Sequence, residues 1–395
     1  MKIMKRNSVW KLLCCVLLII GTIAVAILPT AGLSTPEKEI DALCVDAFAM
    51  RRPQKKPYAP NSTDATSETD SEMTVAPEMF RDLSVYPGGM PFGVKFFTEG
   101  VTVVGLSEVE GKSGKVNPAS RAGLKPKDVI LSVNGQTLAG ASALTDLIEN
   151  CGGNALTLHC KRGNSEFDTQ LIPEWCEAES RYKTGIWVRD SGAGIGTVTF
   201  IIPETGAFAG LGHGICDADT GALIPMKRGS VSDVTISSVV RGAAGAPGEL
   251  KGYFNAGKVG SLLGNSASGV WGVYSKLPEM DCEPMPVGLR DEIEEGDAYI
   301  LSTLDSNKIE RYDIRISNIN RDAKGSKCFT VTVTDPDLLA TSGGIVQGMS
   351  GSPIIQNGKI VGAVTHVLIN DPTTGYGIFI ENMLTAVNIP MAKAS

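Results

Sequence analysis

The 395-residue sequence predicts a mainly β protein that is directed to a membrane at its N-terminus. From Trp175 onward, Gly, Val, Thr and Ser dominate, and short alternating apolar and polar runs such as 231–240 recur without long helical patterns. Strands at this spacing are typical of an all-β barrel domain, which we expect to close with a helix after Ile380. The region 83–173 instead combines three short predicted strands with a helix over 142–149 and indicates a separate α+β domain. Two folded domains and an N-terminal tail account for this chain length.

The N-terminus has the pattern of a membrane-directing segment. Four basic residues in positions 1–11 precede the apolar run 12–28, an order that inserts a chain with its start in the cytoplasm. The run is at the short edge of a spanning helix, which needs about 20 residues, and the small residues at 30–32 would suit a signal peptidase. We therefore expect a cytoplasmic basic tail at 1–11, a signal peptide or membrane anchor at 12–30, and an exported remainder.

The segment 31–82 is predicted to be a flexible linker. Its central part carries several prolines and then a polar run from Asn61 to Glu72, with too little apolar surface to fold. Such a stretch is accessible to proteases.

Composition restricts the chemistry. The net charge is −7 and no basic stripe is present, which argues against nucleic acid as a partner. Nine cysteines are an odd number without a disulfide framework, so buried thiols are expected, with Cys151–Cys160 as a possible pair. No Cys or His spacing resembles a zinc site, and no cofactor is predicted.

The run Gly-Met-Ser-Gly-Ser-Pro at 348–353 is the strongest chemical signal. Glycines on both sides of Ser350 permit a tight turn and leave space for a substrate carbonyl. The following residues 354–364 read as strand, Asn-Gly turn and strand, a strong hairpin signal. Ser350 is therefore predicted to be a nucleophile directly ahead of a β-hairpin.

This order of elements resembles the C-terminal barrel of chymotrypsin-like serine peptidases. The resemblance implies two six-stranded barrels within 175–395 and an oxyanion hole formed by the backbone N–H groups of Gly348 and Ser350. It also implies that Thr365 and His366, at the end of the strand after the hairpin, lie where substrate is bound.

A serine nucleophile needs a base, usually histidine. Of the three histidines, His159 lies in an alternating strand of the smaller domain and is expected to be structural. His366 ends the strand after the hairpin, where a role at the pocket rim and plain packing are both open. His213 stands in the glycine-rich turn 210–214 after an apolar strand and is the predicted base. Cys216, three residues further on, lacks such a turn and ranks below Ser350 as a nucleophile.

The carboxylate that orients the base has more than one candidate. Asp335 follows an alternating strand and precedes a proline, so its backbone is fixed, and it is our first choice. Asp217 and Asp219 lie close after the base in what reads as a polar turn, and they stay open as alternatives.

A closer resemblance spans nearly the whole chain. The segments 210–214, 334–336, 343–353, 362–366 and 370–372 are similar to those of the stage IV sporulation protein B peptidases. The family implies a membrane anchor, a PDZ domain and a trypsin-like domain with the triad His213, Asp335 and Ser350.

The run 118–135 in the smaller region resembles the PDZ domains of bacterial proteases, with Lys127 in place of a common glycine. Such domains add an extended peptide to a sheet edge. Phe92, Gly93 and Val94 are the candidate peptide-binding loop, and a purely docking role is the alternative.

The resemblance implies a serine endopeptidase at the forespore membrane, or in the space between forespore and mother cell. It would cleave itself in the linker and cleave a membrane-bound sporulation regulator, so that a late sigma factor is activated. The alternative is a non-catalytic PDZ adaptor with a degraded peptidase barrel.

Overall fold

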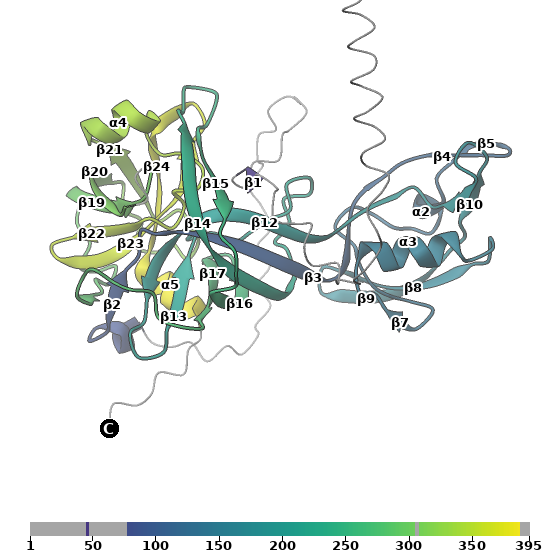
Figure 1. The fold of residues 1–395 in the computed structure, drawn as a ribbon, viewed down its shortest axis with the longest axis horizontal. Coiled ribbons are helices and arrows are strands. Elements are labelled where there is room, and N and C mark those ends of the chain that lie inside the picture. Colours follow the sequence, from purple (N-terminus) through teal and green to yellow (C-terminus); the bar gives the residue numbers. More distant parts are fainter. Residues whose placement is uncertain (1–44, 47–76, 305–307, 388–395) are drawn as a thin grey trace, which may run out of the picture. The chain divides into compact units, whose positions relative to one another are not determined.

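The computed structural model describes residues 45–46, 77–304 and 308–387 (Figure 1). The expected basic tail, the membrane segment and most of the expected linker, with its cleavage site, lie outside these residues. No helix within the described ranges is long and apolar enough to cross a membrane.

Six strands form the first barrel. Each pairs with the next and the last returns to the first, in the order β14-β16-β17-β13-β12-β3-β14. The strands are β3 (Pro91–Leu106), β12 (Ile186–Ile201), β13 (Ala207–Gly210), β14 (Met226–Val240), β16 (Gly260–Ser266) and β17 (Gly269–Tyr274). Phe92, Phe208 and Val231 are among the buried residues that fill it. β15 (Glu249–Phe254) extends β14 beyond the barrel and also pairs with β1 (Val45–Asp46).

The second barrel is closed in the order β19-β20-β21-β24-β23-β22. Its strands are β19 (Gly296–Ser302), β20 (Glu310–Ser317), β21 (Phe329–Val333), β22 (Pro353–Gln356), β23 (Lys359–Leu368) and β24 (Asp371–Phe379). The predicted hairpin is confirmed: Asn357 and Gly358, with φ of 51° and 76°, form the turn between β22 and β23. Two six-stranded barrels, as expected, make up the larger part of a mainly β fold that is consistent with the chymotrypsin-like architecture.

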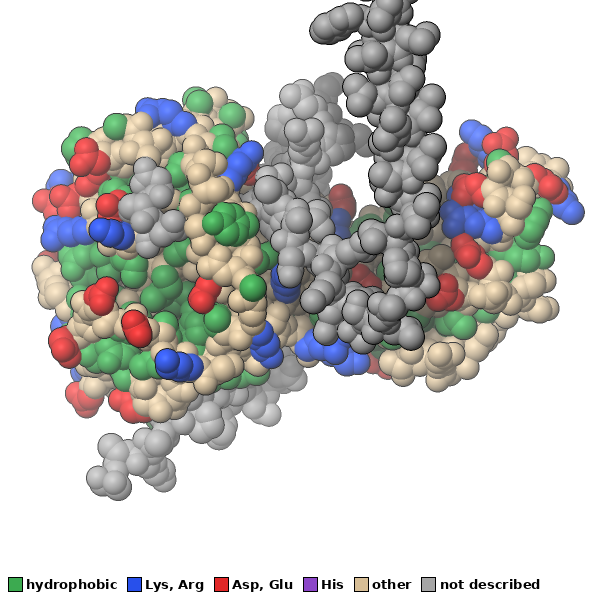
Figure 2. All heavy atoms as spheres, viewed as in Figure 1, with side chains coloured by type: hydrophobic (Ala, Val, Ile, Leu, Met, Phe, Trp, Pro, Cys, Tyr) green, Lys and Arg blue, Asp and Glu red, His purple; other side chains and the backbone are tan. Residues whose placement is uncertain are grey.

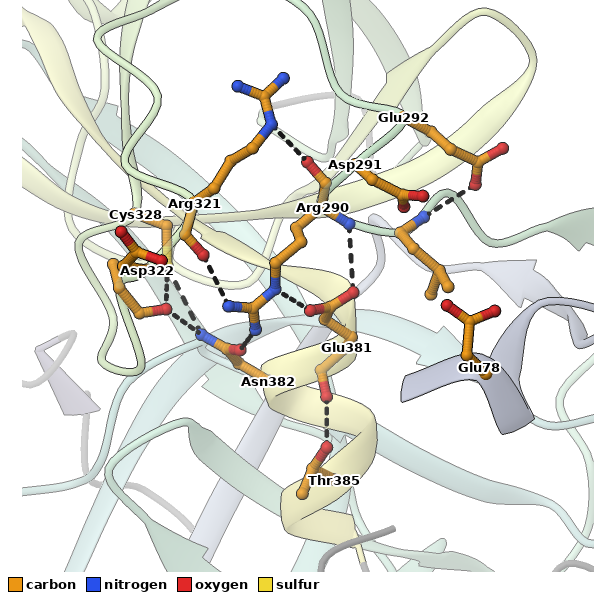
Figure 3. A network of polar contacts seen from close by, with 12 residues as sticks. Glu78, Arg290, Asp291, Glu292, Arg321, Asp322, Cys328, Glu381, Asn382 and Thr385 are labelled. Carbon is orange, nitrogen blue, oxygen red and sulfur yellow. Dashed lines mark hydrogen bonds and ion pairs between the residues drawn. The ribbon is translucent and has the colours of Figure 1, made fainter. Parts of the chain in front are cut away.

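Helix α4 (Pro336–Ser342) follows β21, and helix α5 (Ile380–Val387) follows β24 where a closing helix was predicted. α5 contacts strands of both barrels. Glu381, only 1% exposed, makes an ion pair with Arg290 and also accepts from its backbone N–H at 3.1 Å (Figure 3). The guanidinium donates further to Asn382 at 2.9 Å and to the carbonyl of Arg321 at 2.7 Å. This network compensates a buried charge and ties the last helix to the segment that enters the second barrel.

The smaller domain is built on the continuation of β3 beyond the first barrel. β6 (Val129–Val133) pairs with β3, β7 (Gln136–Thr137) and β8 (Leu156–Arg162), and β8 pairs with β9 (Ser165–Leu171). Leu144 and Ile148 of helix α3 (Ala141–Glu149), within one residue of the prediction, pack into the core of this domain. The remaining elements are α2 (Pro118–Arg121), β4 (Val109–Gly111), β5 (Gly114–Val116), β10 (Glu174–Cys176) and β11 (Arg181–Lys183).

The boundary between the two domains differs from the prediction. Residues 91–98 of β3 pair with β12 and β14 inside the first barrel, and β2 (Ser84–Pro87) pairs with β12 and β18 (Met285–Pro286). The smaller domain therefore does not begin at residue 83. Long strands run through both domains, and a prediction that divides the chain at a single position cannot represent a shared strand. The linker also ends earlier than 82: the short helix η1 (Pro77–Phe80) buries Phe80 in the core.

Side chains of opposite charge are interspersed among apolar ones on the face of the molecule in Figure 2. All six cysteines in the described ranges are free thiols. The possible Cys151–Cys160 disulfide is therefore not formed. Cys160, Cys176 and Cys328 are buried as expected, whereas Cys216 and Cys282 are exposed.

Candidate active site

Ser350 lies on a turn between α4 and β22 that only glycine allows. Gly348 and Gly351 on either side have φ of 99° and 98°, a region that other residues rarely adopt. A Cβ on Gly351 would lie 2.0 Å from the carbonyl oxygen of Thr197 on β12. Gly351 therefore permits two things: the conformation of the turn, and the close approach of this turn to the first barrel.

Two threonines of β12 hold this turn from the first barrel. The buried Thr197 hydroxyl donates to the carbonyl of Gly348 at 2.7 Å, and its backbone N–H donates to the carbonyl of Ser350 at 3.0 Å. The Thr199 hydroxyl donates to the carbonyl of Gly351 at 2.8 Å. Sequence reasoning missed both residues, which read as ordinary members of an alternating strand, and no local signal identifies their partners about 150 residues away.

The turn leaves two backbone donors free. Within the described residues, the N–H groups of Gly348 and Ser350 have no hydrogen-bond acceptor, whereas Met349 N–H donates to Val346 at 3.1 Å. Unpaired backbone N–H groups are rare in folded proteins, and such a pair beside a serine hydroxyl is the arrangement that stabilises an oxyanion. These two N–H groups belong to the residues for which an oxyanion hole was predicted.

The Ser350 hydroxyl donates to the carbonyl of Thr365 on β23 at 2.7 Å. The Thr365 hydroxyl in turn donates to the carbonyls of Ser326 and Tyr376 at 2.7 and 3.1 Å, which fixes this point of the strand. Thr365 thus lies beside the candidate nucleophile. No hydrogen bond joins Ser350 to His213 in the described conformation.

His213 follows β13 on a turn in which Leu211 and Gly212 both have φ of 66°. Gly212 packs against Thr365, so the loop of the first barrel contacts β23 of the second. The Nδ1–H of His213 donates to the carbonyl of Gly214 at 3.1 Å, a tautomer that leaves Nε2 as a proton acceptor. Burial lowers the pKa of His213, with the bond to Gly214 acting in the opposite direction. The imidazole is therefore neutral and able to act as a base at neutral pH.

His366 is the nearest ring to His213. The centroids of the two imidazoles are 4.8 Å apart and the rings are tilted by 38°. His366 Nδ1 is buried and has no hydrogen-bond partner within the described chain. Burial, His213 and Lys327 together lower the pKa of His366 to about 4. A neutral ring of the second barrel thus packs against the candidate base.

No hydrogen bond or ion pair joins Asp335 to His213 in the described chain. Asp335 is the N-cap of α4: one carboxylate oxygen accepts the N–H groups of Asp337 and Leu338 at 3.0 and 2.9 Å. The other accepts the N–H of Asp313 at 3.2 Å. Asp followed by proline is a strong helix-start signal, and this cap engages one carboxylate oxygen while the other bonds to β20.

The alternative acids do not contact His213 either. Asp217 is buried and forms an ion pair with Arg189 of β12, and Asp219 pairs with the same guanidinium at 3.0 Å. Asp217 also accepts the N–H groups of Asp219 and Thr220, which makes it the anchor of the turn after the base. Cys216 is an exposed residue, but partial desolvation of its sulfur, followed by the charge of Asp217, raises the pKa of its thiol and disfavours a thiolate nucleophile.

His159 forms ion pairs within the smaller domain. It pairs with Asp168 at 2.7 Å and Glu166 at 3.2 Å across the β8–β9 hairpin, and these partners raise its pKa, Asp168 foremost. It lies on β8 of the smaller domain, where the sequence placed it.

The predicted peptide-binding loop is a buried strand. Phe92 and Val94 are 1% and 0% exposed in the core of the first barrel, and Gly93 packs against the ring of Phe254. The prediction for these three residues is wrong, because β3 begins in the barrel and enters the smaller domain only later.

Two six-stranded barrels, with a serine on a glycine turn beside two free amides, define the fold and site of a serine peptidase. The model of the SpoIVB peptidase S55 family matches residues 180–384. The chain belongs to this family and is a serine peptidase.

Curated relatives match only a small part of the chain. It is 34% identical over 100 residues to a probable CtpA-like serine protease of Staphylococcus aureus (strain COL), covering 22% of this chain and 20% of the relative. A putative zinc metalloprotease of Nostoc sp. is 43% identical over 60 residues, covering 14% and 16%. The chain thus spans about a fifth of the length of the curated relatives it matches.

Among solved structures, the active form of the Rv3671c protease from M. tuberculosis is similar with a TM-score of 0.29 at 17% identity, covering 51% of this chain and 76% of that chain. Its inactive form gives a TM-score of 0.27 at 16% identity, covering 49% and 85%.

Proposed function

We propose that this peptidase is an endopeptidase of sporulation signalling that works outside the cytoplasm, at the forespore membrane or in the space between forespore and mother cell. Its substrates are a membrane-bound regulator, whose cleavage leads to activation of a late sigma factor, and the chain itself. Membership of the SpoIVB peptidase S55 family supports this role. The basic and then apolar N-terminus supports export and attachment to a membrane.

The proposed chemistry uses groups of both barrels. Ser350 turns away from the carbonyl of Thr365 and gives its proton to Nε2 of His213 as its oxygen attacks the scissile carbonyl. The N–H groups of Gly348 and Ser350 stabilise the tetrahedral oxyanion, and His213 returns the proton to the leaving amine. The observation that carries this proposal is the pair of free amide donors beside the Ser350 hydroxyl.

We also propose that Thr365 and His366 line the substrate site, since the Ser350 hydroxyl donates a hydrogen bond to the strand that carries them. The smaller domain is proposed to be of the PDZ type on the basis of its 118–135 run. Its peptide-binding edge would have to lie away from Phe92–Val94, which the barrel core occupies.

The test is to express the full chain as wild type, Ser350→Ala and Ser352→Ala and to follow its self-cleavage over time. Ser352 is a matched control because its hydroxyl is buried and bonded to Ser302 at 3.1 Å, away from the oxyanion donors. We expect cleavage in the wild type and in Ser352→Ala, and none in Ser350→Ala. Equal processing of all three would contradict self-cleavage by Ser350 and favour the adaptor alternative.

A further inference from the structure

Strand β12 runs from the smaller domain into the first barrel (Figure 1). Arg189 pairs with Thr102 in the part of β3 that belongs to the smaller domain, whereas Ser191 pairs with Phe97 in the barrel. The register between the two strands therefore shifts at Asp190, which lies at the joint between the domains. An irregularity of this kind interrupts the ladder, so the side chains around it decide how the two parts of the strand are held.

The carboxylate of Asp190 caps helix α3 of the smaller domain. Its Oδ2 accepts the N–H of Ala141, the first residue of the helix, at 2.7 Å. The residue at the N-cap position is Gly140, which has no side chain to accept a hydrogen bond. A Cβ on Gly140 would lie 2.6 Å from Asp190 Oδ2, so glycine also makes room for this contact. An aspartate 49 residues from Ala141 along the chain thus replaces the side chain of the N-cap residue.

The preceding residue, Arg189, holds the turn that follows the candidate base. Its guanidinium forms an ion pair with Asp217, which is 3% exposed, and donates to Asp219 at 3.0 Å. Asp217 in turn accepts the N–H groups of Asp219 and Thr220, so the ion pair fixes the backbone shortly after His213. Consecutive residues of β12 therefore connect the N-terminus of α3 to the loop that carries the base.

A small cavity lies beside this ion pair. Thr102, Asp217 and residues 222–225 are among the residues that line it, and the hydroxyl of Thr102 is buried without a hydrogen-bond partner in the described chain. The turn is thus held to β3 and β12 by polar contacts rather than by close packing. These contacts are the ion pair and the hydrogen bond from the N–H of Glu99 to the carbonyl of Pro225 at 3.1 Å. A shift of β12 at this point would move the turn with it.

We propose that Asp190 is a positioning residue of the peptidase site: by holding β12 against the N-terminus of α3, it fixes the strand from which Arg189 holds the turn after His213. The smaller domain is then part of the active enzyme rather than only an attached module. Asp190 acts on the backbone that carries the base and leaves the acid that assists the imidazole to another residue. This inference rests on the proposed roles of Ser350 and His213.

The experiment measures the rate at which a fluorophosphonate probe labels Ser350 in the full chain. Asp190→Ala removes the contact with α3. We expect the maximal labelling rate at saturating probe to fall about 5- to 20-fold, with little change in the probe concentration that gives half of that rate. Asp190→Asn keeps an acceptor for the N–H of Ala141 and should recover most of the rate.

Asn117→Ala is the matched control. It removes a helix cap of the same domain, since Asn117 accepts the N–H of Ser120 in α2 at 2.9 Å, but this cap does not involve β12. We expect Asn117→Ala to label at the wild-type rate. A loss as large as that of Asp190→Ala would mean that any weakened helix of the smaller domain slows the enzyme, and would overturn the specific role of Asp190.

A double variant separates positioning from helix stability. Asp190→Ala combined with Gly140→Asn returns an N-cap to α3 itself, in the space that the carboxylate leaves, without restoring the link to β12. We expect its unfolding temperature to recover toward that of the wild type while labelling stays slow. Recovery of both would overturn the proposal, and so would a wild-type labelling rate in a folded Asp190→Ala. If Asp190→Ala does not fold, the double variant decides alone.

The proposed function fails separately. Ser350→Ala must abolish labelling in every variant, and an unlabelled wild type would reject the catalytic role of Ser350 and this inference with it. A labelled wild type beside an equally fast Asp190→Ala would reject the inference alone.

Discussion

The loop that carries Ser350 and the loop that carries His213 meet at the candidate active site, but different contacts fix their conformations. The conformation of the serine loop depends on its own residues. Gly348 and Gly351 adopt positive φ angles, and within the described residues the N–H groups of Gly348 and Ser350 have no acceptor. The histidine loop is fixed by residues far away in the chain, with Arg189 anchoring Asp217 and His366 packing on the ring. A nucleophile can be recognised from six consecutive residues, whereas the partner of a base cannot.

The two loops are also joined. The Thr197 hydroxyl on β12 donates a hydrogen bond to the serine loop. The N–H of Leu211, at the start of the histidine loop, donates to the carbonyl of the same threonine at 3.2 Å. The backbone of one strand therefore sets the spacing between nucleophile and base.

Gly351→Ala is the change that should break the serine loop most severely. The new methyl would lie 2.0 Å from the Thr197 carbonyl at a φ of 98°, so overpacking and backbone strain add up to a loss of about 3–5 kcal/mol. Thermal unfolding and fluorophosphonate labelling measure it. Gly358→Ala, also at positive φ but in open space, should cost only about 1–2 kcal/mol and keep labelling. Equal effects would mean that the contact with β12 is unimportant.

Arg189→Leu should break the histidine loop in a comparable way. It leaves Asp217 buried without its cation, which we expect to lower the free energy of unfolding by about 2–3 kcal/mol, because Asp217 keeps two backbone donors. Labelling of Ser350 should fall with it. The exposed Arg311→Leu serves as the control, and a stability loss no larger than that of the control would refute the anchoring role.

Thr197→Val tests the connection between the two loops rather than either loop by itself. Valine keeps the shape of the side chain and leaves the carbonyl of Gly348 without its buried donor, at a cost of about 1–2 kcal/mol. Chemical denaturation gives the stability, and we expect the labelling rate to fall by more than in Thr199→Val, whose bond is to Gly351 rather than to an oxyanion residue. The reverse order would place the more important bond at Thr199.

Asp335→Ala tests whether the carboxylate is a helix cap. Removing the cap of α4 should cost about 1 kcal/mol, and Asp335→Asn should restore most of it because Asn caps nearly as well. Urea unfolding of the two variants distinguishes this from a purely catalytic role, for which neither variant would change stability.

The histidine side should add a pH effect on stability. The pKa of His366 is about 4 in the folded protein and near 6.5 in the unfolded chain, and that of His213 is also lowered. The unfolded chain therefore binds more protons between these values, so stability is lost as pH falls from about 6.5 to about 4. His366→Phe should reduce the difference between unfolding temperatures at pH 7 and pH 4.5; an unchanged difference would mean that His366 does not contribute.

Local patterns predicted much of the fold. Asn357-Gly358 forms its hairpin, α3 and α5 form where helices were predicted, and the alternating runs after Trp175 become barrel strands. The errors lie where β-pairing is long-range. Phe92–Val94 was predicted as the peptide-binding loop of the smaller domain, but it pairs with β12 and β14, more than 90 residues further along the chain.

The sequence by itself determined the class of protein, the serine on its glycine turn and the two amides beside it, because these depend on backbone angles that glycine alone permits. Only the tertiary structure decided what surrounds the base. Asp335 has the residue type of a triad acid, but a carboxylate binds the nearest strong donors, and the first turn of α4 supplies them. His366 lies against His213 because one barrel packs on the other, and no spacing along the chain encodes this contact.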